Sequence, residues 1–162
     1  MKKIYLLILI AAFLLASITV AAQTGNAPVK VPEDIKEMTE KIGYSYGLCP
    51  EILQAIAFYE SSFRPEAKNG TCIGLMQINE PFHRERMNRL GVTDLYDPYQ
   101  SILMAADYIM ELKELHHDIA IVLMAYNGFR KPAEYAERTG QISDYASKVL
   151  ELSAQLERYH GK

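Results

Sequence analysis

The sequence predicts a single, mainly α-helical domain with at most a very small β element. Its 162 residues, of which 49% are apolar, are enough for one domain with a sizeable core and too few for two. Apolar residues recur at helical spacing in separate stretches at residues 50–63, 102–112 and 145–159. Residues that favour helix ends and turns lie between these stretches.

Residues 1–22 have the pattern of an export signal. Two lysines begin the segment, an apolar run follows at residues 4–20, and residues 20–22 offer a small-residue cleavage site. The pattern predicts export to the periplasm or the cell wall. Alternatively, residues 4–20 are just long enough to cross the ~30 Å hydrocarbon core and stay as an uncleaved anchor. Residues 23–31 are polar and contain proline, which predicts a flexible lead-in to a domain at residues 32–162.

The charge pattern argues against nucleic-acid binding. The chain has 17 Lys and Arg residues and 20 Asp and Glu residues, a formal net charge of −3, and the two signs are interspersed. A nucleic-acid-binding domain usually carries a basic face or stripe. We therefore exclude this class of function.

The helices are predicted in order from their end signals and apolar faces. The first begins at Pro32, ends near Gly43 or Gly47, and has an inward face of Ile35, Met38 and Ile42. Asp97-Pro98 starts a later helix, because Asp caps free N–H groups and Pro fits the first turn. We expect that helix at the centre of the fold, with a core face of Ile102, Ala105, Ala106, Ile109 and Leu112.

Two more helices complete the predicted domain. Residues 119–126 are almost wholly apolar, and Asn127-Gly128 follows as a helix end. The terminal helix is expected to pack onto the domain through a stripe of Tyr145, Val149, Leu152, Leu156 and Tyr159.

Residues 81–90 predict a helix with a charged face. Its basic side chains are expected to lie mostly in water, since a run of charges is usually a solvated face: His83, Arg84, Arg86 and Arg89. Alternatively, the same stretch borders a groove that binds a polymer.

Glu60 is the residue that departs most from its surroundings. The apolar residues from Pro50 to Phe63 fall within about 120° of one another at ~100° per residue, and Glu60 lies inside that arc. An unpaired charge removed from water costs several kcal/mol unless it is paired or takes up a proton. Either Glu60 serves a chemical function, as such local contradictions often do, or it turns outward or pairs with Arg64.

Three motifs around Glu60 resemble a known family. The run Glu60-Ser61-x-Phe63-x-Pro65-x-Ala67 is followed by Gly74-Leu75-Met76-Gln77 and later by Ala125-Tyr126-Asn127. In this order the motifs resemble the soluble lytic transglycosylases and their goose-type lysozyme relatives, over roughly residues 32–152. The resemblance implies a lysozyme-like fold that acts on peptidoglycan glycan strands without a metal or an organic cofactor.

The resemblance also implies a reaction. In this family one Glu acts as acid and then as base, and the C6 hydroxyl of the muramyl sugar attacks in place of water, which leaves a 1,6-anhydro end. Glu60 would be that residue, with Tyr126 approaching it so that the hydroxyl orients the carboxyl. Burial would raise the pKa of Glu60 enough for it to donate a proton near neutral pH.

The remaining motif residues are expected to bind substrate, and they are Ser61, Gly74, Leu75, Met76, Gln77 and Asn127. For Leu75 and Met76 a core position is the alternative. The sequence differs from the family pattern at residues 69–73 and at residues 128–131, where substrate subsites would be shaped. Glycan length and peptide tolerance are therefore less well predicted than the reaction.

Two other functions stay open. A hydrolytic muramidase would use the same fold but let water attack. A wall-binding or assembly protein would help a secretion or conjugation apparatus cross the wall, with catalysis secondary or absent.

Cys49 and Cys72 are the two cysteines of the chain, an even number in a protein predicted to be exported. They bracket the Glu60 helix, and we expect a disulfide that would contribute roughly 3 kcal/mol of stability. The alternative is two separate thiols. With no histidine nearby in the sequence, we do not predict a metal site at this pair.

Overall fold

The computed structural model describes residues 28–162. The predicted export signal, the possible anchor at residues 4–20 and most of the lead-in lie outside the described residues. None of the helices within residues 28–162 is long and apolar enough to span a bilayer.

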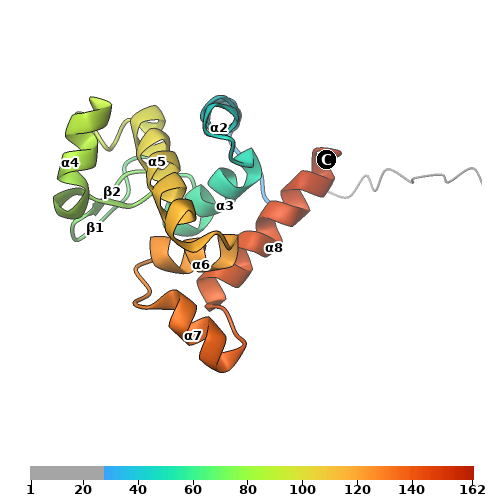
Figure 1. The fold of residues 1–162 in the computed structure, drawn as a ribbon. Helices are drawn as coiled ribbons and strands as arrows, with labels where there is room; N and C mark the ends of the chain where they lie inside the picture. The colour runs from blue at the N-terminus through green and yellow to red at the C-terminus, as the bar shows by residue number, and fades with distance from the viewer. Residues whose placement is uncertain (1–27) are drawn as a thin grey trace, which may run out of the picture.

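The described chain folds into seven helices and a small three-stranded sheet (Figure 1). The helices are α2 (Glu33–Tyr46), α3 (Pro50–Ser61), α4 (Glu80–Leu90), α5 (Pro98–His116), α6 (Ile119–Tyr126), α7 (Pro132–Thr139) and α8 (Asp144–Tyr159). The strands are β1 (Lys68–Asn69), β2 (Cys72–Ile73) and β3 (Ile78–Asn79), paired antiparallel in the order β1-β2-β3. The mainly α-helical fold with a very small β element is thereby confirmed.

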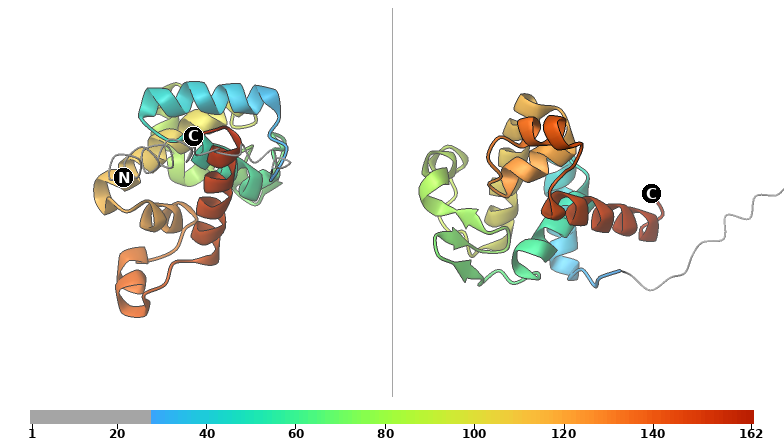
Figure 2. Two further views of the ribbon diagram at one scale, coloured as in Figure 1. Left: turned by 90° about the vertical axis from the view of Figure 1, so that its right-hand side faces the viewer. Right: turned by 90° about the horizontal axis from the view of Figure 1, so that it is seen from below.

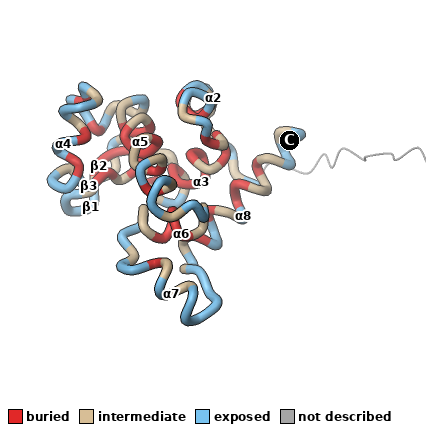
Figure 3. Tube along the Cα trace, viewed as in Figure 1, coloured by how far each residue is buried: buried red, intermediate tan, exposed pale blue. Residues whose placement is uncertain are grey.

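Helix α5 lies at the centre of the helical body, as predicted. It packs against α2, α3, α4 and α6 and against strand β3. Figure 3 shows buried residues running along α3 and α5. The fully buried side chains of α5 include Ile102, Met104, Ala105, Ala106 and Ile109.

The helix ends follow the signals in the sequence. At the start of α5, Asp97 Oδ1 accepts a hydrogen bond from the Gln100 N–H over 2.8 Å. Gly47 ends α2 with a φ of 64°, and Gly128 follows α6 with a φ of 79°. These predicted boundaries are confirmed.

The loop after β2 is held tightly against the chain that leads into α5. Gly74 has a φ of 80°, and a Cβ atom on it would lie 1.9 Å from the carbonyl oxygen of Leu95, so the position requires glycine. The Met76 N–H donates to Ser101 Oγ over 3.1 Å. Residues 74–77 are therefore fixed to the beginning of α5.

Helix α4 differs from the prediction in what it buries. Arg84 and Arg89 are exposed as expected, but His83 and Arg86 are only 6% and 8% exposed. The expectation that these side chains lie mostly in water is confirmed for Arg84 and Arg89 and wrong for His83 and Arg86. Arg86 is buried because carboxylates of α5 pair with its guanidinium, which offsets the loss of hydration.

The last two helices show two further differences. Helix α7 was not predicted, although Pro132 in its first turn and Gly140 at its end are ordinary helix signals. It projects from the body and packs mainly on α6 (Figures 1 and 2). In α8, Tyr159 is 53% exposed, and the buried members of the predicted stripe are Val149, Leu152 and Leu156.

Candidate active site

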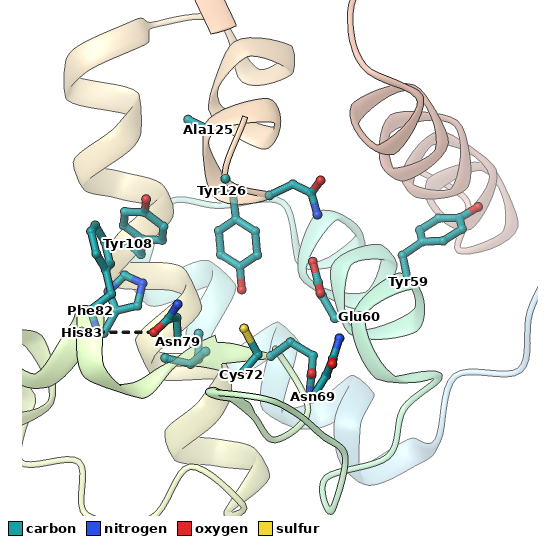
Figure 4. Close-up of a pocket in the computed structure, with 14 residues that line it drawn as sticks. Tyr59, Glu60, Asn69, Cys72, Asn79, Phe82, His83, Tyr108, Ala125 and Tyr126 are labelled. Carbon is teal, nitrogen blue, oxygen red and sulfur yellow. Dashed lines mark hydrogen bonds between the residues drawn. The ribbon is translucent and has the colours of Figure 1, made fainter. Parts of the chain in front are cut away.

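A groove of about 530 Å³ lies between the end of α3, the sheet, the start of α4, α5 and the end of α6. Figure 4 shows Glu60 and Tyr59 on one side, Phe82, His83 and Tyr108 on the other, and Tyr126 and Cys72 between them. The other lining residues are Asn69, Gln77, Ile78, Asn79, Ala125, Asn127 and Gly128. Among the residues that line the groove, Glu60 is the one carboxylate.

The backbone turns sharply directly after Glu60. Ser62 and Phe63 both have positive φ, 54° and 61°, a conformation that residues other than glycine seldom adopt. Ser61 holds this turn, because its hydroxyl donates to a carbonyl one turn earlier and accepts the Arg64 N–H, each over 3.1 Å. Arg64 Nε donates to the Ser61 carbonyl over 2.9 Å, and within residues 28–162 Arg64 forms no ion pair with Glu60.

The carboxyl group of Glu60 has a protein partner in α8. The Tyr145 hydroxyl donates to Glu60 Oε1 over 2.7 Å. Burial raises the pKa of Glu60, while hydrogen bonds from Tyr145 and from the Asn127 amide oppose that rise by stabilising the charged form. Burial and the nearby Glu60 charge also raise the pKa of Tyr145, so its hydroxyl keeps its proton and acts as the donor.

Tyr126 lines the groove near Glu60, as predicted, but its hydroxyl has a different partner. Its hydroxyl donates to the Met76 carbonyl over 2.9 Å, so it ties the end of α6 to the loop after β2. The prediction that the Tyr126 hydroxyl orients the Glu60 carboxyl is corrected: Tyr145 makes that contact. Tyr145 was not predicted as a site residue, because a tyrosine on an apolar stripe is usually a core residue. The signal that the sequence did offer was a tyrosine hydroxyl on an otherwise apolar face of the terminal helix.

The other predicted substrate residues divide into two groups. Gln77 and Asn127 line the groove. The Gln77 amide is held in place because its Nε2 donates to the Gly74 carbonyl over 2.9 Å and to the Ala67 carbonyl over 3.2 Å. Four predicted residues do not line the groove, because they hold the turn or fill the core behind it: Ser61, Gly74, Leu75 and Met76. For Leu75 and Met76 the core alternative is therefore correct.

The expected disulfide is absent, and both cysteines are free thiols. Cys49 precedes the first turn of α3, whereas Cys72 lies in the groove at the other end of this helix. A helix of 12 residues is about 18 Å long, which is far beyond the reach of a disulfide. The prediction was wrong because it rested on the even number of cysteines, and the sequence pattern does not show how far apart the two residues lie in the fold.

Phe82 and His83 line the groove, which agrees with the alternative that residues 81–90 border a groove, whereas the part played by Tyr108 of α5 was not predicted. The His83 ring packs edge-on against Phe82 and Tyr108, with ring centroids 4.8 and 4.5 Å away. Its Nδ1 contacts Arg86 Nη1, and Arg86 is in turn bonded to Asp107 over 2.8 Å. Because a guanidinium only donates, His83 Nδ1 must accept, and the ring proton then resides on Nε2.

The described residues offer no group of three or more His, Cys, Asp or Glu side chains that would hold a metal ion. The polar side chains that line the groove are Glu60, His83, the tyrosines, the asparagines, Gln77 and the thiol of Cys72.

Comparison with known proteins gives consistent matches. Residues 37–146 match the family described as "Transglycosylase SLT domain". The chain is 31% identical over 106 residues to a protein of Enterobacteria phage PRD1 named "Transglycosylase", covering 65% of this chain but 37% of the phage protein. It is 28% identical over 124 residues to "Protein IpgF" of Shigella flexneri, covering 72% of this chain and 81% of that protein.

The matched range contains Glu60 and both residues that donate hydrogen bonds to its carboxyl group, Asn127 and Tyr145. It covers more than half of the chain. The chain therefore belongs to the transglycosylase SLT domain family and is an enzyme of the lytic transglycosylase type.

Proposed function

We propose that the protein cleaves the β-1,4 bond between N-acetylmuramic acid and N-acetylglucosamine in peptidoglycan and leaves 1,6-anhydro ends. The observation that supports this most directly is a single carboxyl group, Glu60, with a raised pKa in a groove otherwise lined by aromatic, amide and small side chains. Water-using glycosidases usually need a second carboxylate. An intramolecular attack by the sugar's own hydroxyl does not.

The proposed reaction uses Glu60 twice. Protonated Glu60 gives its proton to the glycosidic oxygen as the bond from C1 of the muramyl sugar to that oxygen breaks. The C6 hydroxyl then bonds to C1, and its proton returns to the Glu60 carboxylate. No water is consumed, and the enzyme ends in its starting protonation state.

The contacts of Glu60 suit both steps. Tyr145 donates to Oε1, so in the protonated form the acidic proton resides on Oε2. After transfer, the Tyr145 hydroxyl and the Asn127 amide stabilise the carboxylate until it takes the proton back.

The test is mass spectrometry of the soluble products released from purified peptidoglycan. We expect muropeptides lighter by one water than the hydrated species, and no release by Glu60→Gln. Glu66→Gln is the matched control, because Glu66 lies in the loop directly after the helix that carries Glu60 but outside the groove, and it should release products like the wild type. Hydrated products would favour a muramidase, and binding without release would favour a wall-binding protein.

We also propose export, because the substrate lies outside the cytoplasm. The prediction rests on residues 1–22 of the sequence. The intact mass of the protein recovered from its compartment decides between cleavage, with a chain beginning near Gln23, and an anchor that keeps Met1. A wall-spanning apparatus as partner stays a prediction.

A further inference from the structure

Helices α3 and α8 lie side by side and run in opposite directions (Figure 1). At one end, Tyr145 in the first turn of α8 contacts Glu60 in the last turn of α3. At the other end, the beginning of α3 contacts the end of α8 and the residues after it. The pair is thus joined by polar contacts at both ends.

The second set of contacts forms a cluster that we call the α3–α8 clasp, consisting of Cys49, Glu51, Glu157, His160 and Lys162. Glu51 is fully buried, and its Oε1 lies 2.7 Å from Lys162 Nζ and 2.8 Å from His160 Nδ1. Cys49 Sγ lies 3.1 Å from Glu51 Oε2 and 3.3 Å from Glu157 Oε1. The buried charge of Glu51 at the beginning of α3 is therefore compensated only when the end of α8 and the residues after it lie in this position.

Between its two ends, the interface is mostly apolar. The buried residues that α8 contributes are Ala146, Val149, Leu152, Ser153 and Leu156. Apolar contact is non-directional and by itself tolerates small sliding movements of one helix along another. Directional contacts to a buried charge do not tolerate such movements, because an unpaired Glu51 carboxylate would cost several kcal/mol.

We propose that the α3–α8 clasp positions Tyr145 against Glu60 by fixing the register of α8 along α3. Glu51 is then a positioning residue for a carboxyl group about 14 Å away along the same helix. Its catalytic consequence rests on the proposed function, but the coupling between the two ends does not.

The test follows the ionisation of Glu60 by NMR in protein labelled with carbon-13 at the glutamate side chains, with Glu60→Gln identifying its signal. Tyr145→Phe should raise the midpoint of the Glu60 titration by about one pH unit, because the carboxylate loses one hydrogen-bond donor. Glu51→Gln should shift the midpoint part of the way in the same direction. Cys72 and Tyr126 are the other titratable groups near Glu60, and these variants leave both unchanged.

The double variant Glu51→Gln/Tyr145→Phe separates positioning from general loosening. If the clasp acts through Tyr145, Glu51→Gln adds no further shift once Tyr145 is Phe. Ile109→Val in α5 is the control for modest destabilisation, and it should leave the midpoint unchanged. Should Glu51→Gln fail to fold, Lys162→Met removes one clasp partner and should give the same pattern.

Two results would overturn the inference: a Glu60 midpoint that Glu51→Gln and Lys162→Met leave unchanged, or shifts that simply add in the double variant. Failure of the proposed function is a separate outcome. In that case the wild-type protein releases no anhydro products, whatever the NMR midpoints are.

Discussion

Tyr145 donates a hydrogen bond to Glu60 Oε1 over 2.7 Å and thereby joins the first turn of α8 to the last turn of α3. The two residues are 85 positions apart in the sequence. The surroundings of the one carboxyl group that lines the groove are therefore a product of helix packing.

Replacing Tyr145 by Phe should lower kcat roughly tenfold, since the carboxylate formed in the first step loses a hydrogen bond to a charged group. The pH at which activity falls on the alkaline side should rise, because the pKa of Glu60 is no longer lowered by this donor. Rates measured over a pH series check both effects. Tyr126→Phe is the contrast, because it removes a bond to the Met76 carbonyl and should leave the alkaline limit in place.

Glu60→Gln should unfold at a higher temperature than the wild type at neutral pH. The pKa of Glu60 is raised in the folded protein, so its contribution to stability is complete below the ordinary value of 4.5 and is lost as pH rises through the folded pKa. A neutral Gln avoids that loss. Thermal unfolding of both proteins at pH 4 and pH 8 checks the sign, and the gain should vanish at the lower pH.

Glu51 should show the opposite dependence on pH. Although burial raises its pKa, hydrogen bonds from Lys162, His160 and Cys49 outweigh burial and lower it to about 2. Its stabilisation is complete above the ordinary value of 4.5 and is lost as pH falls toward about 2. Glu51→Gln should destabilise the protein by on the order of 1–3 kcal/mol at neutral pH and progressively less in acid, as measured by urea unfolding.

His83 should remain neutral through the working range of the enzyme. Burial, with the neighbouring Arg86 charge, lowers its pKa to about 4. We expect its Nε2 proton to serve as a donor to glycan on the aromatic side of the groove. His83→Phe should raise KM roughly three- to tenfold, the effect of one hydrogen bond, and His83→Gln should restore part of it because its amide can place a donor near the Nε2 position. Equal KM values in all three proteins would argue against this role.

The two thiols should behave separately. Reducing agent should not change the unfolding temperature, because there is no disulfide to break. Labelling of Cys72 with a bulky maleimide should block activity, and bound glycan should slow this labelling. The Cys72→Ser variant should be active, and the maleimide should not inhibit it. Labelling should accelerate as pH rises, because burial raises the pKa of this thiol. An enzyme that stays active with Cys72 fully modified would exclude this cysteine from the substrate path.

Most of the helices predicted from sequence were those with strong local signals, although α7 was not predicted despite such signals. The bounds of α6 were set by a local apolar run and Asn127-Gly128, and Glu60 was conspicuous because its charge broke a local pattern. Tyr145 and the separation of the cysteines depend on how α3 meets α8 and how long α3 is. No local pattern encodes those distances. His83 and Arg86 were misplaced for the same reason, because Arg86 is buried against carboxylates of α5 and His83 against Tyr108 of the same helix.

The measurement that tests the central claim most directly is digestion of peptidoglycan in water enriched in heavy oxygen, followed by mass spectrometry of the released ends. If Glu60 directs an attack by the sugar's own C6 hydroxyl, the products are lighter by one water than the hydrated species and contain no heavy oxygen. Hydrated muramyl ends that carry heavy oxygen, lost in Glu60→Gln, would contradict the claim and show that water is the nucleophile.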